Sequence, residues 1–101
     1  MQNGVLNDVY QLLRHVKAVD SESEFSRDWL GRSDCYLRTC RFKNTEPSVG
    51  TLAICASKLQ HYGQRMLKAN RNRMVAERFL DLSAACHDQI NQQSTDLWLA
   101  D

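Results

Sequence analysis

The sequence has one proline in 101 residues and no run of about 20 apolar residues, the length that a membrane-spanning helix needs. Its first four residues lack the basic and apolar regions of a signal peptide. Glycine is scarce too, with four residues, and none forms a phosphate-binding loop. We therefore expect a cytoplasmic protein without a membrane partner.

Motifs of catalysis and metal binding are also missing. The sequence has no H-E-x-x-H or G-x-S-x-G, and spacing pairs none of its three histidines with a serine or cysteine. Its four cysteines form no C-x-x-C pair to begin a zinc site. Three of them, at apolar positions of helical patterns, act as small hydrophobes: Cys40, Cys55 and Cys86. We expect no enzyme, no metal and no cofactor.

What is present is the composition of one small globular domain, with 43% hydrophobic and 25% charged residues. Apolar residues recur at spacings of three and four, which predicts an all-α fold. We expect a compact bundle of four N-terminal helices and a long C-terminal helix. The predicted helices are 3–18, 21–30, 33–42 and 48–62, and the last pattern runs from 63 to about 93, with a turn or kink near 70–73.

Charge is unevenly distributed along the chain, although the net charge is only +1. Residues 32–78 carry 10 basic and 3 acidic side chains, whereas residues 79–101 carry 4 acidic and no basic ones. Local positive charge supplies most sequence-independent affinity for DNA, so the basic block favours a nucleic-acid partner. Alternatively, these side chains only solvate helix faces.

The segment 24–59 has the helix-ending and helix-starting residues that are typical of a helix-turn-helix. Gly31 suits the left-handed position that ends a helix, and Ser33 can accept the free N–H groups that begin the next one. Upstream, Ser21 and Glu24 fit a capping box at the start of the first of these helices. A DNA-binding protein is therefore our leading hypothesis.

These residues resemble a known family. Gly31, Ser33 and Leu37, followed by the stretch from Pro47 to Leu59, are similar to lambda-repressor-like, Xre-type helix-turn-helix regulators, whose fourth helix reads P-S-x-x-x-L-x-x-x-A-x-x-L. The family's leucine-alanine pair before the glycine is displaced here by one residue, to Phe25 and Ser26. Either the helix carries an extra residue, or it packs in a shifted register.

The resemblance implies that residues 33–42 form a recognition helix in the major groove of double-stranded DNA. Arg38 suits guanine O6 and N7, and Asp34 can accept from cytosine N4. Other residues would meet base edges or the DNA backbone, and the full predicted DNA-binding set is Ser33, Asp34, Cys35, Arg38, Arg41, Lys43 and Asn44.

The chain divides, in this interpretation, into a helix-turn-helix DNA-binding domain at 1–62 and a helical dimerisation or docking segment at 63–101. An apolar stripe on the long helix either folds back on the first helix or pairs with a second copy. We favour a homodimer, since regulators of this resemblance usually read two half-sites. The predicted dimerisation residues are Val75, Phe79, Leu82, Cys86 and Ile90.

The rival hypothesis is a protein-interaction module: an adaptor, antirepressor or small inhibitor derived from a helix-turn-helix and without DNA binding. The displaced pair in the second helix and the acidic C-terminal end with Trp98 motivate it. The surface of helix 33–42 discriminates between the two. A DNA reader presents its basic side chains at an open face, whereas an adaptor covers that face.

Overall fold

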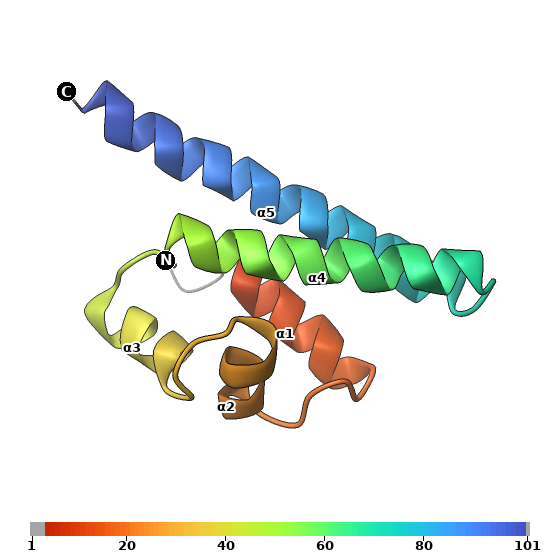
Figure 1. Cartoon of the computed structure of the whole chain (residues 1–101). Coiled ribbons are helices and arrows are strands. Elements are labelled where there is room, and N and C mark those ends of the chain that lie inside the picture. The colour runs from red at the N-terminus through yellow and green to blue at the C-terminus, as the bar shows by residue number, and fades with distance from the viewer. Residues whose placement is uncertain (1–3, 101) are drawn as a thin grey trace.

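The computed structural model describes residues 4–100 and is all-α, with its elements arranged as an elongated body of 47 × 27 × 20 Å (Figure 1). Five elements are α-helices and one is a π-helix, η1. Their bounds are α1 Val5–His15, α2 Glu22–Glu24, η1 Phe25–Trp29, α3 Tyr36–Lys43, α4 Val49–Lys68 and α5 Arg73–Leu99. The predicted all-α fold with a long C-terminal helix is confirmed.

The two longest helices, α4 and α5, run antiparallel along each other, and α1, α2 and η1 lie on one side of this pair (Figure 1). The chain reverses between them at residues 69–72. Asn70 and Asn72 have left-handed backbone there, with φ of 55° and 46°, a conformation that asparagine tolerates better than most residues. The predicted turn near 70–73 is therefore present.

Gly63 does not end α4, and this prediction was wrong. The helix continues through it to Lys68, because Gly63 is buried where α5 approaches closely and tertiary packing outweighs the low helix propensity of glycine. The division into 1–62 and 63–101, which falls inside α4, stays a prediction.

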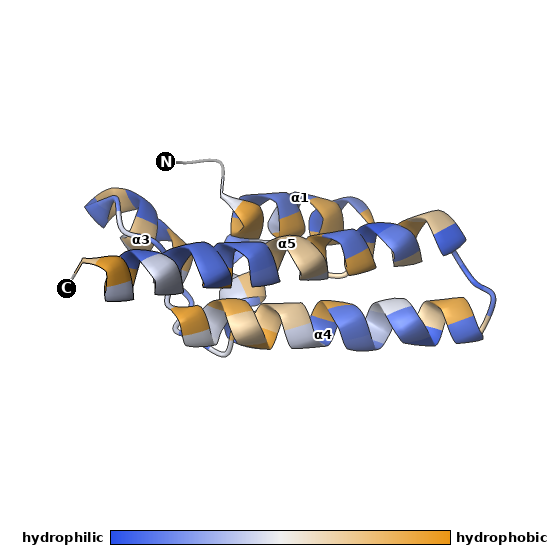
Figure 2. Ribbon diagram, turned by 90° about the horizontal axis from the view of Figure 1, so that it is seen from above, coloured by the Kyte–Doolittle hydropathy of each residue, from blue (hydrophilic) through white to orange (hydrophobic). Residues whose placement is uncertain are grey.

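One hydrophobic core joins α1, η1, α4 and α5. Trp29 meets Phe79 edge-on, with ring centroids 6.2 Å apart, and Tyr10 packs against Phe25 at 5.7 Å. The helices turn their apolar sides inward and their polar sides outward over most of the body (Figure 2). The fully buried side chains include Leu13, Phe25, Leu30, Leu52 and Leu59.

The stripe predicted for dimerisation lies largely inside this core. Phe79, Leu82 and Cys86 are buried, and Val75 and Ile90 are partly buried against the same cluster. Most of α5 packs on α4, and part of it on α1, so folding back within one chain covers the stripe. A dimer that used the three buried residues would have to open the core. Dimerisation itself stays a prediction.

In residues 4–100, no helix combines the length and the hydropathy that crossing a membrane requires.

Candidate nucleic-acid interface

A glycine turn separates η1 from α3. Gly31 has a φ of 66°, a conformation that side chains with a Cβ rarely adopt, and it follows the fully buried Leu30. The backbone N–H of Arg32 donates to the carbonyl oxygen of Ser26 at 2.9 Å, which closes the turn. The predicted helix end at Gly31 is confirmed.

A capping arrangement begins α2. The Ser21 hydroxyl accepts a hydrogen bond from the Glu24 backbone N–H at 3.2 Å, and the Glu24 carboxylate accepts one from the Asp20 N–H at 2.8 Å. The first bond caps a backbone N–H of α2, and this half of the predicted capping box is confirmed. The Glu24 carboxylate reaches the Asp20 N–H and not the Ser21 N–H that the predicted box requires.

The helix before the turn carries the extra residue. Residues Phe25–Trp29 form a π-helix, in which the Leu30 N–H donates to the Phe25 carbonyl oxygen five residues back, at 3.2 Å. A π-helical turn is the usual form of a one-residue insertion in an α-helix. It brings both Phe25 and Ser26 into the core, where both are fully buried. Of the two alternatives for the displaced pair, the π-helical turn favours the inserted residue.

The third helix begins later than predicted. α3 starts at Tyr36, so that Ser33, Asp34 and Cys35 lie in the turn before it. Ser33 satisfies the first N–H through its backbone: its carbonyl oxygen accepts from Tyr36 at 3.1 Å. Its hydroxyl lies 3.6 Å from the Cys35 thiol. The predicted capping by the Ser33 side chain was therefore wrong, because this side chain has another partner.

Tyr36 anchors the start of α3. Its ring is half-buried against the core, and its hydroxyl accepts a hydrogen bond from the Ser48 N–H at 3.1 Å. The Arg32 guanidinium stacks over the same ring, 4.6 Å from the centroid, a cation–π contact. The helix is thus held at the beginning of α4 while most of its surface stays open.

The outward face of α3 is formed by Arg38, Thr39 and Phe42, all exposed. Phe42 has 89% of its surface accessible. In the part of the chain that the structure describes, neither Arg38 nor Lys43 makes a hydrogen bond or an ion pair. Sequence reasoning missed Thr39 and Phe42, although a spacing of four places Phe42 beside Arg38 and a spacing of three places it beside Thr39.

Arg41 has a different position from Arg38. Its guanidinium pairs with the Glu22 carboxylate at 2.8 Å and so ties α3 to α2. Both side chains are partly exposed, and such a surface pair contributes about 0–1 kcal/mol. Asn44 ends α3 in left-handed conformation, with a φ of 54°, and donates its N–H to the Arg41 carbonyl oxygen at 3.2 Å. The structure thus brings Arg38 and Lys43 to the open surface and turns Arg41 toward α2.

The Cys35 thiol is exposed in the turn that precedes α3. Hydrogen bonds from Ser33 and then Thr39 lower its pKa below the ordinary value, because they stabilise the thiolate. In the core, the hydrogen bond with Cys86 and burial raise the pKa of Cys55. The four thiols are free, and residues 4–100 contain no group of three or more metal-ligating side chains.

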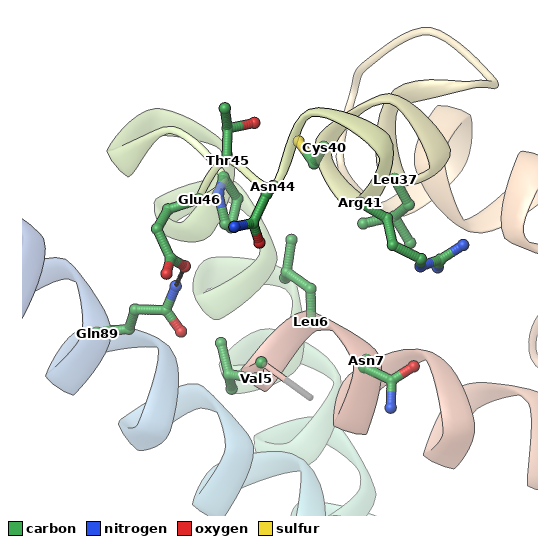
Figure 3. A pocket seen from close by; sticks show the side chains of 12 residues that line it. Val5, Leu6, Asn7, Leu37, Cys40, Arg41, Asn44, Thr45, Glu46 and Gln89 are labelled. Carbon is green, nitrogen blue, oxygen red and sulfur yellow. Dashed lines mark hydrogen bonds between the residues drawn. The ribbon is translucent and has the colours of Figure 1, made fainter. Parts of the chain in front are cut away.

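A cleft of about 300 Å³ separates α3 from α1 (Figure 3). Its apolar lining consists of Val5, Leu6, Leu37, Cys40 and Pro47. On the α5 side, the Gln89 amide donates to the Glu46 carboxylate at 3.2 Å. No side chain of α3 is buried. With the cleft beside it, α3 is therefore more loosely packed than α1, α4 and α5.

Part of the basic block lies away from α3. Lys58, Arg65 and Arg71 line a wider groove between η1 and the second half of α4. The Lys58 ammonium donates to the Asp28 carbonyl oxygen and lies 5.2 Å from the centre of the Trp29 ring. The ten basic residues of 32–78 therefore do not form one continuous surface with α3.

Comparison with known proteins identifies one family. The model of the family of unknown function DUF6626 matches residues 6–99. The chain belongs to this family. The DUF6626 match extends from α1 to the last turn of α5 and includes both the Gly31 turn and the cleft beside α3. No curated protein and no solved structure matches the chain.

Proposed function

We propose that this DUF6626 protein is a sequence-specific DNA-binding transcriptional regulator that reads the major groove with α3 and acts as a homodimer. The observation that carries the proposal is the open face of α3, which follows a glycine turn and bears an arginine that makes no hydrogen bond or ion pair within the described residues. A recognition helix needs such a surface, because base edges lie deep in the groove and only projecting side chains reach them.

The chemistry of the open face suits this task. Arg38 can donate two hydrogen bonds to O6 and N7 of one guanine, and the exposed ring of Phe42 can contact a thymine methyl group. Lys43 follows toward the end of the helix and can neutralise a phosphate. Ser33, Asp34 and Cys35 lie in the preceding turn, where Asp34 can accept from cytosine N4 and the other two can meet neighbouring bases.

Two further residues support α3 from the side. Arg41, already paired with Glu22, holds the helix against α2, and the other N–H groups of its guanidinium can donate to a phosphate. Asn44 follows Lys43 and ends the helix with its left-handed backbone. Both are assigned to positioning and phosphate contact.

The test is fluorescence-anisotropy titration of DNA from upstream of the gene, against a scrambled duplex, between about 50 and 200 mM salt, where phosphate contacts reveal themselves. We expect a preference for the upstream DNA that survives added salt. Equal affinity for both duplexes at every salt concentration would contradict a sequence-specific reader. No binding at low salt would remove DNA as a partner.

The second candidate is a protein-interaction module without DNA binding. Phe42 favours it, because a large apolar side chain with 89% exposure is typical of a protein contact as well as of a groove reader. The two candidates differ in what Phe42→Ala changes. If the protein reads DNA, this variant binds the duplex more weakly than wild type. If the protein is an interaction module, wild type does not bind DNA, and the variant instead fails to bind the protein partner.

A further inference from the structure

The last turn of α5 is an apolar helix end without a cover. Leu97, Trp98 and Leu99 are 71%, 64% and 65% exposed, and this end of α5 projects beyond the other helices (Figure 1). Successive residues of an α-helix point about 100° apart, so three in a row surround much of the helix. A concave site that receives the middle residue, Trp98, can also contact Leu97 and Leu99 on either side of it.

A concave apolar site of suitable size lies beside α3. The cleft of about 300 Å³ has room for one indole side chain, and Val5 and Leu6 form its floor, with Leu37 and Cys40 above them (Figure 3). The polar groups at its α5 side are already paired: Glu46 with Gln89, and the Pro47 carbonyl oxygen with the Gln93 amide at 2.9 Å. An apolar guest therefore leaves these bonds intact.

The α5 end cannot reach the cleft of its own chain. Gln89 and Gln93 tie α5 to the loop at the mouth of the cleft, and the helix continues in one direction from there. At 1.5 Å per residue, Trp98 lies about 7 Å further along the axis than Gln93. Returning it to its own cleft would require breaking the last turns of α5. The guest must therefore come from another molecule.

Charge indicates which molecule this is. In the described part of α5 after Arg78, every charged side chain is acidic: Asp81, Asp88 and Asp96. The α3 segment of residues 32–43 carries four basic side chains and one acidic one, and of the basic ones Arg41 lines the cleft. An acidic helix end with an apolar tip and a cleft beside a basic helix are complementary surfaces of the same chain. A second copy of this protein thus carries both halves of the contact.

We propose that the α5 end of each chain, with Trp98 at its centre, inserts into the α1–α3 cleft of a second copy, so that two identical contacts form a two-fold dimer. This assignment rests on the homodimer in the proposed function and names its surfaces. The contact reaches the Leu37 and Cys40 side of α3. The opposite side, with Arg38, Thr39 and Phe42, stays open to DNA.

The first experiment measures molar mass by light scattering across a range of protein concentrations. Wild type is expected to form a dimer, and Trp98→Ala to raise its dissociation constant at least tenfold. Met74→Ala is the matched control: Met74 is also exposed, at 82%, but lies at the start of α5. A monomeric wild type, or a Trp98→Ala variant as dimeric as wild type, would overturn the proposal.

A complementation experiment separates this contact from a symmetric pairing of two α5 ends. Cys40→Glu places a carboxylate in the half-buried lining of the cleft and should oppose the acidic guest. Trp98→Ala and Cys40→Glu should each be largely monomeric alone, and their mixture should form a heterodimer through one intact end and one intact cleft. Circular dichroism confirms that both are folded. A mixture that stays monomeric overturns the exchange.

Failure of this proposal is distinguishable from failure of DNA binding. If the dimer forms through another surface, Trp98→Ala leaves the mass unchanged, and binding to the upstream duplex still reports on α3. If α3 does not read DNA, the mass experiment keeps its expected result while the anisotropy titration shows no preference. The two measurements therefore test the two assignments separately.

Discussion

Gly63 of α4 lies directly against Leu80 of α5: a Cβ atom at position 63 would be 3.0 Å from Cδ2 of Leu80 and 3.2 Å from the carbonyl oxygen of Ala76. The absence of a side chain at this point lets the two long helices approach each other. The glycine at position 63 thereby determines how closely α4 and α5 pack against each other.

We expect Gly63→Val to lower the free energy of unfolding by about 1–3 kcal/mol, the usual cost of overpacking a tight contact. Its branched side chain cannot avoid both Leu80 and the Ala76 carbonyl group. The matched control is Gly50→Ala in the first turn of α4, where an added Cβ meets nothing within 4 Å. This control should raise stability by up to about 1 kcal/mol through helix propensity. Urea unfolding measures both, and equal effects of the two variants would contradict the packing role of Gly63.

Gly31→Ala should destabilise the protein by about 1–2 kcal/mol, because a Cβ is unfavourable at a φ of 66°. Space is not the reason, since the nearest atom to an added Cβ is Cδ1 of Ile54 at an ordinary 3.9 Å. Gly31→Asn should cost clearly less, as asparagine tolerates left-handed backbone. Thermal unfolding of both variants provides the comparison, and an asparagine variant as unstable as the alanine variant would point to a clash.

Two buried serines should respond differently to alanine. The Ser83 hydroxyl donates to the Ala56 carbonyl oxygen at 2.8 Å and joins α5 to α4, so Ser83→Ala should cost about 1 kcal/mol. The buried Ser26 hydroxyl has no hydrogen-bond partner in residues 4–100. Ser26→Ala should therefore leave stability equal or raise it by about 1 kcal/mol at most, since no bond is lost. Chemical denaturation measures the stability of both variants, and a large loss of stability in Ser26→Ala would reveal a partner for the Ser26 hydroxyl.

Arg38→Ala should weaken binding to the cognate duplex by about 1–3 kcal/mol and leave the melting temperature unchanged, because this exposed side chain makes no hydrogen bond or ion pair with residues 4–100. Arg78→Ala removes an exposed arginine from α5 and is the control of equal charge. Anisotropy titration at fixed salt measures both. Equal losses for the two variants would mean that charge alone, and no base contact, is involved.

Cys35 should react with iodoacetamide at neutral pH faster than Cys55 and Cys86. Its pKa is lowered, first by the hydrogen bond with Ser33, so a larger fraction is thiolate at pH 7, whereas Cys55 and Cys86 are buried. Ser33→Ala should raise the pKa of Cys35 and move its rate profile to higher pH. Mass spectrometry of the alkylated peptides gives the rates, and an unmoved profile would exclude Ser33 as the cause.

The sequence by itself determined the features that depend on local chemistry. Apolar spacings of three and four predicted the helices. Gly31 predicted the turn, and Ser21 with Glu24 predicted the start of a helix, because these residues act on backbone groups only a few positions away. The same reasoning placed Arg38 on the outward face of the short helix after the turn, because helical spacing is a local property.

Only the tertiary structure decided the rest, because it depends on residues far apart in the sequence. Gly63 continues a helix where local propensity would end it, since Leu80 and Ala76 occupy the space of its side chain. Phe79, Leu82 and Cys86 face α4 and α1, which no periodicity could distinguish from a second copy. The π-helical turn buries both Phe25 and Ser26. The exposure of Phe42 and Trp98 depends on which side chains the assembled core covers.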